Sequence, residues 1–237
     1  MQKGEFLYEG KAKRIYATDE PGILWMEFKD DATAGNGAKR GTIGDKGRIN
    51  AEITRRVYEH LEASGVRTHL VRTESPTVLL VKKLEMFHLE VVVRNIAAGS
   101  LVKRIGLEEG REMAQPIVEL YLKDDALGDP ILNDEHVIAL GLASPEELAG
   151  LKAAARRVNE LLRPYFEERG ILLVDFKLEF GKENGAIVLG DEVTPDTCRF
   201  WDAKTREKLD KDRFRQDLGG VEEAYQEVLR RVDAPHA

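Results

Sequence analysis

Apolar and polar side chains alternate along residues 171–180, which read ILLVDFKLEF. A repeat of two places Asp175, Lys177 and Glu179 on one face of a β-strand and apolar side chains on the other. The apolar set is Leu172, Val174, Phe176, Leu178 and Phe180. A strand with so apolar a back face belongs to an internal sheet, where charges of mixed sign indicate a bound ionic group. A surface hairpin held by salt bridges is the alternative.

A turn signal, Asn184-Gly185, follows this strand and predicts a hairpin whose return strand covers residues 186–189. Two registers are possible, and they differ in where Asp191 points. A two-residue loop pairs positions 183 and 186 and turns Asp191 toward the apolar face. A three-residue loop that closes on Gly185 pairs positions 182 and 186 and sets Asp191 opposite Lys177. We expect the second register, because it gathers the charged side chains on one face and buries no lone charge.

Two or three carboxylates with a lysine between them suit a hard divalent cation that carries phosphate groups. Mg²⁺ takes a few carboxylate oxygens and fills its other positions with phosphate and water. The lysine neutralises charge that the metal leaves. The five histidines are scattered without metal-ligand spacing, which argues against a zinc site.

Shorter apolar runs predict strands at residues 5–8, 14–18, 23–28, 77–83 and 89–94. Residues 30–40 are too rich in glycine and charge for a regular element, and form either a functional loop or a mobile linker. Residues 194–199 are expected to leave the sheet with an acid and a base. The charge run at residues 210–215 suits a site or, equally, a solvated face.

Three longer helices follow from the pattern. One begins near Lys46, stops at Gly65, and carries the apolar stripe Ile49, Ile53, Val57 and Leu61. The capping box Ser144-Pro145-Glu146-Glu147 opens a second helix, which ends by Gly170 and which Pro164 should kink or terminate. An amphipathic helix at residues 221–232 packs near the end of the chain.

Three segments could bind anions or a nucleotide. The basic hairpin tip Gly10-Lys11-Ala12-Lys13 lacks the spacing of a Walker loop, but such a hairpin can close over phosphates or remain a solvated loop. The connector at residues 82–86 suits adenine, which takes backbone hydrogen bonds and an apolar shelf. Arg94 with Gly99-Ser100 suits a phosphate, although Ser100 could equally be a plain helix cap.

Composition limits the remaining possibilities. A chain of 237 residues can form one large domain or two lobes. Its single cysteine, Cys198, excludes an internal disulfide, fits a reducing cytoplasm and is expected to be a packing residue. No segment resembles a signal peptide or a membrane span. With a net charge of −7, the molecule is not expected to bind nucleic acid, and local basic clusters indicate anion pockets.

Two segments, LVDFKLEFG at residues 173–181 and EVVVRNIAAGS at residues 90–100, resemble the signature segments of the SAICAR synthetase family. Other segments similar to that family are LYEGKAKRIY, residues 31–39, SLVKRIGLEEG, GDEVTPD and DKDRFRQDLGG. The resemblance covers nearly the whole chain. One position departs from the family pattern: His88 stands where a proline is usual, within the connector and away from the charged positions.

The resemblance implies an α+β fold in two lobes, similar to ATP-grasp enzymes, with antiparallel sheets and flanking helices. We place the lobes at residues 1–84 and 85–237. The implied reaction joins L-aspartate to the carboxylate of carboxyaminoimidazole ribonucleotide in purine biosynthesis, and consumes ATP with Mg²⁺. The family also suggests a homodimer.

The resemblance and the charge pattern together give candidate site residues in four groups. Nucleotide-binding candidates are Gly10, Lys11, Ala12, Lys13, Lys82, Glu85 and Met86. Metal candidates are Glu179 and Asp191, and catalytic candidates are Lys177, Lys123 and Asp175. Substrate-binding candidates are Glu90, Arg94, Ser100, Asp129, Asp196, Arg199, Lys211 and Arg215. Of these, Arg94, Ser100 and Arg199 are expected to face the phosphate of the ribonucleotide.

Two other functions are compatible with the same residues. A small-molecule kinase would use the same metal hairpin to phosphorylate an alcohol and would need no aspartate. A non-catalytic nucleotide-binding module would have no use for all of these lysines and carboxylates. Release of ADP, measured with each co-substrate alone and with both together, separates the three.

Overall fold

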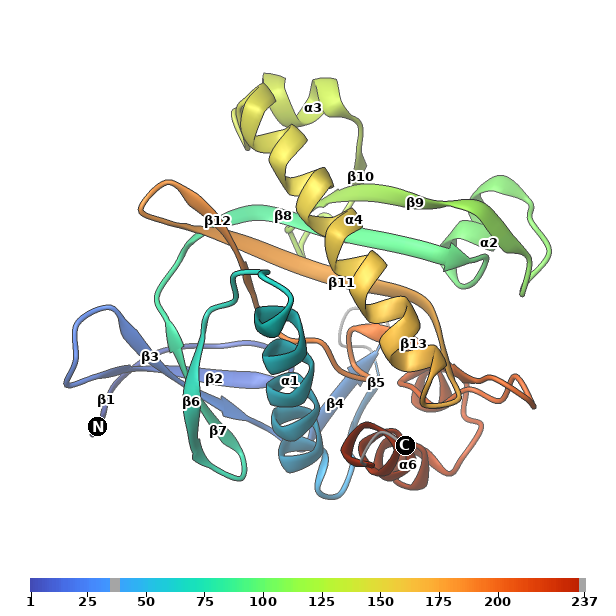
Figure 1. Ribbon diagram of the computed structural model, residues 1–237, viewed down its shortest axis with the longest axis horizontal. Coiled ribbons are helices and arrows are strands. Elements are labelled where there is room, and N and C mark those ends of the chain that lie inside the picture. Colours follow the sequence, from blue (N-terminus) through green and yellow to red (C-terminus); the bar gives the residue numbers. More distant parts are fainter. Residues whose placement is uncertain (35–38, 235–237) are drawn as a thin grey trace.

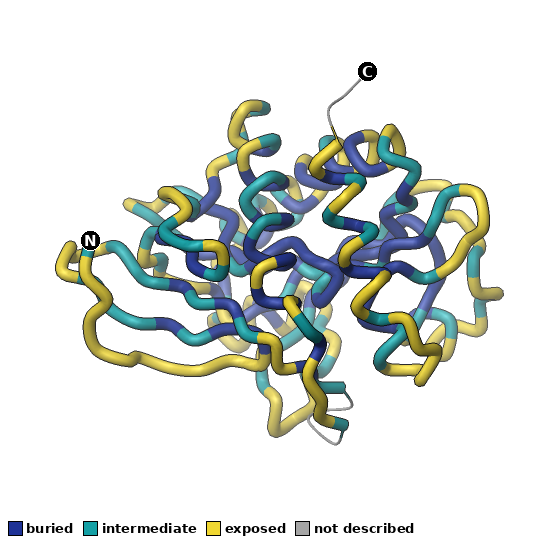
Figure 2. Tube along the Cα trace, turned by 90° about the horizontal axis from the view of Figure 1, so that it is seen from below, coloured by how far each residue is buried: buried dark blue, intermediate teal, exposed yellow. Residues whose placement is uncertain are grey.

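The computed structural model describes residues 1–34 and 39–234, which form an α+β fold with two large antiparallel sheets (Figure 1). The first sheet has the order β1-β2-β3-β7-β6. Its strands are β1 (Lys3–Glu9), β2 (Lys13–Thr18), β3 (Ile23–Phe28), β6 (Leu70–Ser75) and β7 (Val78–Lys82). The predicted strands in this part of the chain are therefore confirmed. β1 is exposed along its whole length at the sheet edge, and it is yellow beside the N-terminus in Figure 2.

The second sheet is organised around β11 (Ile171–Glu183), the strand with the alternating pattern. β11 pairs with β8 (Glu85–Ile96), with β12 (Ala186–Gly190) and with β13 (Cys198–Asp202). Beyond β8 lie β9 (Glu112–Leu122) and β10 (Ile131–Leu132). Residues 194–197 leave the sheet as expected, but β13 begins at Cys198 and returns to pair with the first half of β11. That pairing buries Cys198, Phe200 and Trp201, and so confirms Cys198 as a packing residue.

Three long helices are present, as predicted: α1 (Lys46–Ala63), α4 (Pro145–Glu167) and α6 (Val221–Asp233). The first two pack on the sheets, and α6 packs against α1. α4 lies across the face of the second sheet (Figure 1). Its capping box is present, because the Ser144 hydroxyl accepts from the amide of Glu147 at 3.1 Å and Glu147 accepts in return at 2.9 Å. Pro164 does not terminate α4, which runs on to Glu167. Leu162 and Phe166 are fully buried on either side of the proline, and their packing holds the last turn.

Short elements complete the chain: α2 (Ser100–Ile105), α3 (Asp134–Ala139), α5 (Asp212–Arg215), and a two-stranded sheet of β4 (Asp31–Ala34) and β5 (Lys39–Thr42). The expectation of no regular element at residues 30–40 is wrong for these strands, and residues 35–38 lie outside the described part. Tertiary contacts stabilise the hairpin where composition does not. Ala32 is buried, and Gly41 packs so closely against Phe214 that a Cβ would lie 3.1 Å from its ring.

The register of the β11–β12 hairpin differs from the one that we expected. Glu183 pairs with Ala186, so the loop has two residues. Asn184 and Gly185 have φ of 51° and 79°, the left-handed pair of a type I′ turn that matches the twist of the strands. The charge of Asp191 is not buried among apolar side chains, because β12 ends at Gly190 and Asp191 turns away with φ of 57°. The left-handed backbone at Asp191 therefore keeps its charge off the apolar face in the two-residue register, which removes our reason for expecting the three-residue loop.

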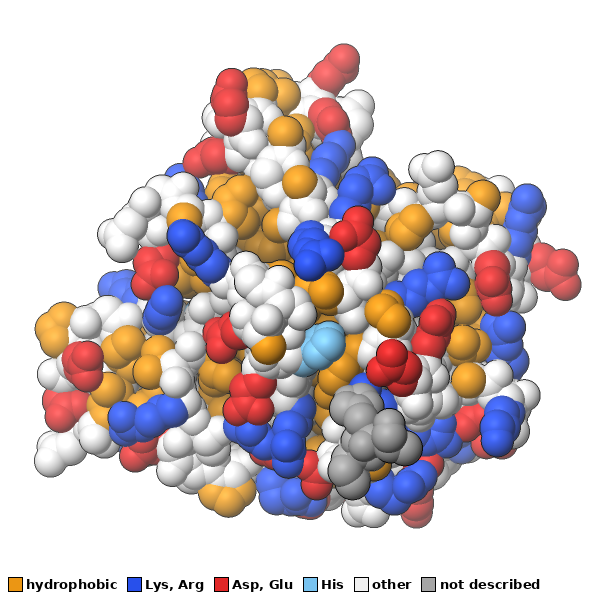
Figure 3. Space-filling view, in the orientation of Figure 1, with side chains coloured by type: hydrophobic (Ala, Val, Ile, Leu, Met, Phe, Trp, Pro, Cys, Tyr) orange, Lys and Arg blue, Asp and Glu red, His pale blue; other side chains and the backbone are white. Residues whose placement is uncertain are grey.

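One hydrophobic core joins the two halves of the chain. The two large sheets divide between Lys82 and Glu85, but the apolar stripe of α1 packs in the same cluster as β8, β11 and α4. The buried segments are dark blue through the middle of Figure 2. On the face in Figure 3, acidic and basic side chains are interspersed rather than gathered by sign. None of the described helices is long and apolar enough to cross a membrane.

Candidate active site

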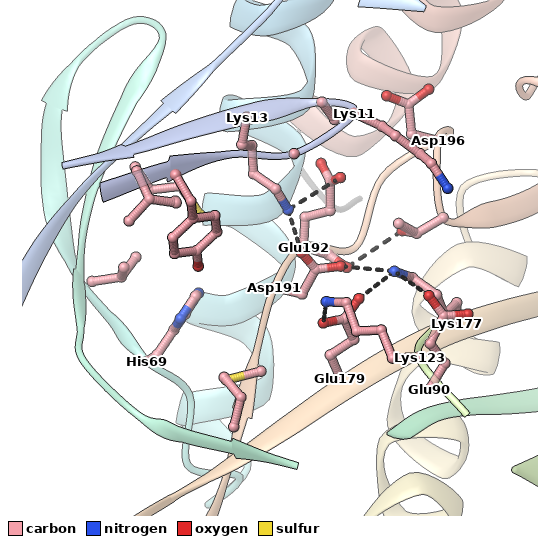
Figure 4. Close-up of a pocket in the computed structure, with 18 of the residues that line it drawn as sticks. Lys11, Lys13, His69, Glu90, Lys123, Lys177, Glu179, Asp191, Glu192 and Asp196 are labelled. Carbon is pink, nitrogen blue, oxygen red and sulfur yellow. Dashed lines mark hydrogen bonds and ion pairs between the residues drawn. The ribbon is translucent and has the colours of Figure 1, made fainter. Parts of the chain in front are cut away.

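A pocket of about 1010 Å³ is lined by residues of both large sheets and of the segments that join them (Figure 4). Every predicted nucleotide-binding residue lines it: Gly10, Lys11, Ala12, Lys13, Lys82, Glu85 and Met86. The predicted metal ligands and two of the three catalytic candidates also line it, namely Glu179, Asp191, Lys177 and Lys123. The fold therefore brings together segments that are more than a hundred residues apart in the sequence.

Lys177 and Asp191 lie at the centre of a cluster of opposite charges (Figure 4). The ammonium of Lys177 is 2.5 Å from a carboxylate oxygen of Glu179, 3.2 Å from Asp191 and 3.3 Å from Glu90. Lys13 reaches the same carboxylate of Asp191 from the β1–β2 hairpin. Lys123 closes the cluster by donating to Glu179. The cations and carboxylates thus neutralise one another inside the pocket.

The pKa values of these groups follow from their partners. Burial alone would lower the pKa of Lys177, but Asp191, Glu179 and Glu90 outweigh it and raise that pKa well above its usual range. Burial would raise the pKa of Asp191, yet Lys13 and Lys177 hold it far below the usual value. Burial raises the pKa of Glu90 above that of a free glutamate. Lys177 and Asp191 therefore stay charged in the pocket.

The corner at Gly190-Asp191 is held by two aromatic residues. The hydroxyl of Tyr58 donates to the carbonyl of Gly190 at 2.5 Å, and the rings of Tyr58 and His69 meet edge to face. Burial, aided by the nearby charge of Lys13, lowers the pKa of His69 to about 4, so the imidazole is neutral. This support fixes the unusual backbone of Asp191, and with it the direction of the carboxylate.

The opposite end of the pocket is apolar. Its walls include Ile15, Leu24 and Met26 of the first sheet, Val81 of β7, and Met86. The connector between β7 and β8 presses against β11 at Gly181, where a Cβ would lie 2.6 Å from the Cβ of Leu84. Only glycine permits this approach. The pocket therefore joins an apolar shelf beside a backbone connector to a cluster of lysines and carboxylates.

Asp175 is placed differently from the other catalytic candidates. Its carboxylate is buried between the guanidinium groups of Arg94, at 2.7 Å, and Arg199, at 2.9 Å, and it does not line the pocket. Arg94 also donates to Glu119 at 2.7 Å and to the Ser100 hydroxyl at 3.1 Å. The predicted grouping of Arg94, Ser100 and Arg199 is thus present, but beside the pocket.

The contact between Arg199 and the start of α2 is close. A Cβ on Gly99, whose φ is 57°, would lie 2.4 Å from a guanidinium nitrogen of Arg199. Glycine is required there for the arginine to lie against the backbone. Arg94 is 3% exposed and fully engaged with its neighbours, whereas Ser100 is exposed at the surface of the same cluster.

The remaining substrate-binding candidates line the pocket: Glu90, Asp129, Asp196, Lys211 and Arg215. Asp196 is held by Lys46 at 2.6 Å and by Tyr225 at 2.8 Å. Burial would raise the pKa of Asp196, but Lys211, Lys46 and the hydrogen bond of Tyr225 overcome that effect and keep the pKa below its usual range. The run at residues 210–215 is not a solvated face, because Lys211 is buried and Arg215 reaches the pocket wall.

Three contributors escaped the sequence analysis. Lys46 was regarded as the start of a structural helix, yet its side chain is fully buried against Asp196. Glu192 lies 3.2 Å from Lys13, and its only signal in the sequence was its place within the segment GDEVTPD, next to Asp191. His69 lines the pocket from a segment that carries no motif. A lone buried lysine or histidine leaves no periodic trace in a sequence.

Glu179 and Asp191 are the two carboxylates in the pocket that could hold one hard cation. Glu179 and Asp191 converge on the single ammonium of Lys177, so two carboxylate oxygens already surround a point of positive charge. Within residues 1–34 and 39–234, no group of three or more His, Cys, Asp or Glu side chains is arranged to hold a metal ion. Two carboxylates fit Mg²⁺, which takes its other ligands from phosphate and water.

Comparison with known proteins gives one consistent result. A model of the SAICAR synthetase family matches residues 6–232. Phosphoribosylaminoimidazole-succinocarboxamide synthases from Desulfitobacterium hafniense and Chloroherpeton thalassium are 57% and 58% identical, over 98% of this chain and 98% and 99% of theirs.

Two solved structures also match over most of both chains. One is described as a SAICAR synthetase (Type-2) in complex with ADP; it is 50% identical, has a TM-score of 0.94, and covers 98% of this chain and 99% of its own. The Type-1 SAICAR synthetase from Pyrococcus horikoshii OT3 is 48% identical with a TM-score of 0.91, over 95% of this chain and 99% of its own. Sequence and fold agree along the full length of the pocket-forming segments, and the chain belongs to the SAICAR synthetase family.

Proposed function

We propose that the pocket is the active site of an ATP-dependent ligase. The enzyme joins L-aspartate to the carboxylate of carboxyaminoimidazole ribonucleotide and yields SAICAR, ADP and phosphate. The observation that carries this proposal is the convergence of Lys13, Lys177, Glu179 and Asp191 beside an apolar shelf, in a chain of this family. That arrangement suits a nucleoside triphosphate and a second anionic substrate.

ATP is proposed to lie with its base on the apolar shelf and its phosphates toward the lysines. The connector at residues 82–86 offers backbone groups to the base, and Leu24, Met26 and Val81 offer apolar contact. Gly10 to Lys13 form the tip of the β1–β2 hairpin over the phosphate end. Lys11 is half-exposed and pairs with Asp125 at 2.6 Å, so it is available to exchange that partner for a phosphate.

Glu179 and Asp191 are proposed to hold Mg²⁺. The ion would offset the charge of the triphosphate and polarise the transferring phosphoryl group. If the two carboxylates held the metal, Lys177 and Lys123 would no longer be needed to neutralise Glu179 and could pair with phosphate oxygens instead.

The chemistry is that of carboxylate activation. A carboxylate is a poor electrophile, and transfer of the terminal phosphoryl group of ATP to it creates a leaving group that the amine of aspartate displaces as phosphate. Positioning and charge neutralisation supply most of the catalysis in such transfers. We assign the stabilisation of the transferring phosphoryl group to Lys177 and Lys123. Asp175 then acts through Arg94 and Arg199, which it holds in place.

The ribonucleotide is proposed to bind beside this centre. Its phosphate suits the exposed Ser100 and the partly exposed Arg199, with Arg94 behind them as the buried support. The other polar candidates on the pocket wall, Glu90, Asp129, Asp196, Lys211 and Arg215, are proposed to contact the rest of the ribonucleotide. Both substrates then meet at Lys177.

The test is ADP release with the ribonucleotide and aspartate present singly and together. Release only when both are present supports the ligase. Turnover with the ribonucleotide alone would indicate a kinase, and no turnover in any combination would indicate a binding module. We further propose that the two sheets mark lobes at residues 1–84 and 85–237, and that the protein is a cytoplasmic homodimer, as the family resemblance suggests.

A further inference from the structure

Tyr8 lines the pocket, although its strand, β1, lies at the edge of the first sheet. The cause is a β-bulge in β1. Phe6 pairs with Tyr16 of β2. Tyr8 pairs with Ile15, so β1 has one residue more than β2 between the two pairs. Side chains two positions apart share a face in a regular strand, and the extra residue therefore places Tyr8 on the opposite face from Phe6.

The two faces of this hairpin have different surroundings. On the outer face, the rings of Phe6 and Tyr16 meet edge to face with centroids 5.5 Å apart, and neither residue lines the pocket. On the inner face, Tyr8 lies beside Ile15, which pairs in turn with Met26. These three residues all line the pocket. Tyr8 thus extends the apolar shelf toward the edge of the sheet.

The hydroxyl of Tyr8 is a hydrogen-bond donor among the charges of the pocket. The charged groups that act on it are Lys123, Lys13, Asp191 and Glu179. Figure 4 shows these four side chains grouped in the pocket. Burial raises the pKa of Tyr8 although the two lysines oppose that effect, so the hydroxyl keeps its proton in neutral solution. Within residues 1–34 and 39–234, no hydrogen bond of this hydroxyl to another residue is described.

A protonated hydroxyl beside lysines suits an anionic oxygen, and hydrogen bonds to charged acceptors are the stronger ones. The hairpin tip that begins at Gly10, two positions after Tyr8, is the segment proposed to cover the phosphates of ATP. We propose that the hydroxyl of Tyr8 donates to a phosphate oxygen of ATP, which makes Tyr8 a nucleotide-binding residue beside Lys11 and Lys13. This inference rests on the proposed binding of ATP in the pocket.

The test compares the binding of ATP, with Mg²⁺ present, and of adenosine, which lacks the phosphates. Both are titrated by calorimetry into the wild type and into Tyr8→Phe, which keeps the ring and removes only the hydroxyl. Loss of a hydrogen bond to a charged oxygen should weaken ATP binding about tenfold. The binding of adenosine should not change. Tyr8 is 57% exposed, so the variant should fold, and melting temperatures of the same samples check this.

Tyr16→Phe is the matched control, because it makes the same change on the outer face of the same hairpin. The ring of Tyr16 lies under the ammonium of Lys3 there, 3.7 Å from its centroid, and away from the pocket. ATP binding should be unchanged in this variant. An equal loss of ATP binding in both variants would overturn the inference, since it would show that any lost hydroxyl disturbs the hairpin.

Two other binding results would also contradict the role of Tyr8. Equal losses of ATP and adenosine in Tyr8→Phe would place the hydroxyl on the base or the ribose. Unchanged binding of ATP would show that the hydroxyl makes no contact with it.

Kinetics then separate the two substrates. In ADP release with the ribonucleotide and aspartate present, Tyr8→Phe should raise the KM for ATP about tenfold and leave the KM for the ribonucleotide unchanged. A rise confined to the ribonucleotide would assign the hydroxyl to that substrate and refute the proposal. If the wild type bound ATP but released no ADP with both co-substrates, the proposed reaction would fail, and the binding comparison would still decide the role of Tyr8.

Discussion

Replacement of Asp191 by asparagine tests the centre of the proposed site. Asparagine tolerates the left-handed backbone of this position, where φ is 57°, so the change removes a charge without adding strain. Lys13 keeps Glu192 at 3.2 Å, and Lys177 keeps Glu179 at 2.5 Å. Each lysine thus retains a carboxylate, and we expect the free energy of unfolding to fall by only about 1–3 kcal/mol.

The effect on catalysis should be much larger. Asp191→Asn removes one of two proposed metal ligands and the charge that both lysines share, and we expect turnover to drop by about 10²- to 10³-fold. The assay is ADP release with the ribonucleotide and aspartate present, over a series of Mg²⁺ concentrations, alongside urea unfolding of the same samples. Activity within tenfold of the wild type at saturating Mg²⁺ and ATP would refute the metal assignment.

Glu192→Gln is the control for this experiment. Glu192 is buried next to Asp191 and touches Lys13, but it makes no described contact with Lys177. Burial raises the pKa of Glu192, and glutamine keeps the shape of the side chain while it removes the charge. We expect turnover to change less than tenfold. A loss of turnover as large as that of Asp191→Asn would mean that any change at this corner disables the site, and it would contradict a specific role of Asp191 as a metal ligand.

Three other substitutions separate binding from stability. Lys11→Ala should raise the KM for ATP with little change in melting temperature. Lys13→Ala should lower both the affinity for ATP and the melting temperature, because Lys13 is buried against Asp191. Similar melting temperatures for the two variants would contradict this contrast. Arg94→Ala should destabilise the protein by about 3–5 kcal/mol in urea unfolding, since it leaves the buried carboxylates of Glu119 and Asp175 short of a partner. Arg94→Lys should recover only part of that stability. A loss under about 1 kcal/mol in Arg94→Ala would show that the cluster is dispensable. His69→Phe should flatten the pH dependence of stability in the apo-protein. Because the folded pKa is about 4 and the unfolded value 6.5, the unfolded chain binds the proton first, and the wild type loses up to about 3 kcal/mol as pH falls through this window; parallel curves for the two proteins would refute the shift.

Local pattern was sufficient for most of the architecture. The alternation of β11, the stripe of α1 and the capping box of α4 each depend on neighbours within one or two turns, and the structure confirms all three. Asn184-Gly185 also identified the hairpin. The register was wrong because we used the side-chain pattern to choose it, whereas the type I′ turn and the left-handed Asp191 satisfied the same pattern with a shorter loop.

The candidate site also has features that the sequence predicts and features that depend on the tertiary structure. Sequence alone indicated most of the charged residues that gather, because strand periodicity points to Lys177 and Glu179 and the family resemblance adds Asp191. Only the tertiary structure decided which of them are open to a ligand. It buries Asp175 and Arg94 in a network of their own. It also brings His69 to the pocket wall and buries Lys46 against the pocket residue Asp196, both from segments without a motif. The physical reason is that burial and unsatisfied hydrogen bonds depend on contacts between distant segments, and no local pattern records which partners those segments will meet.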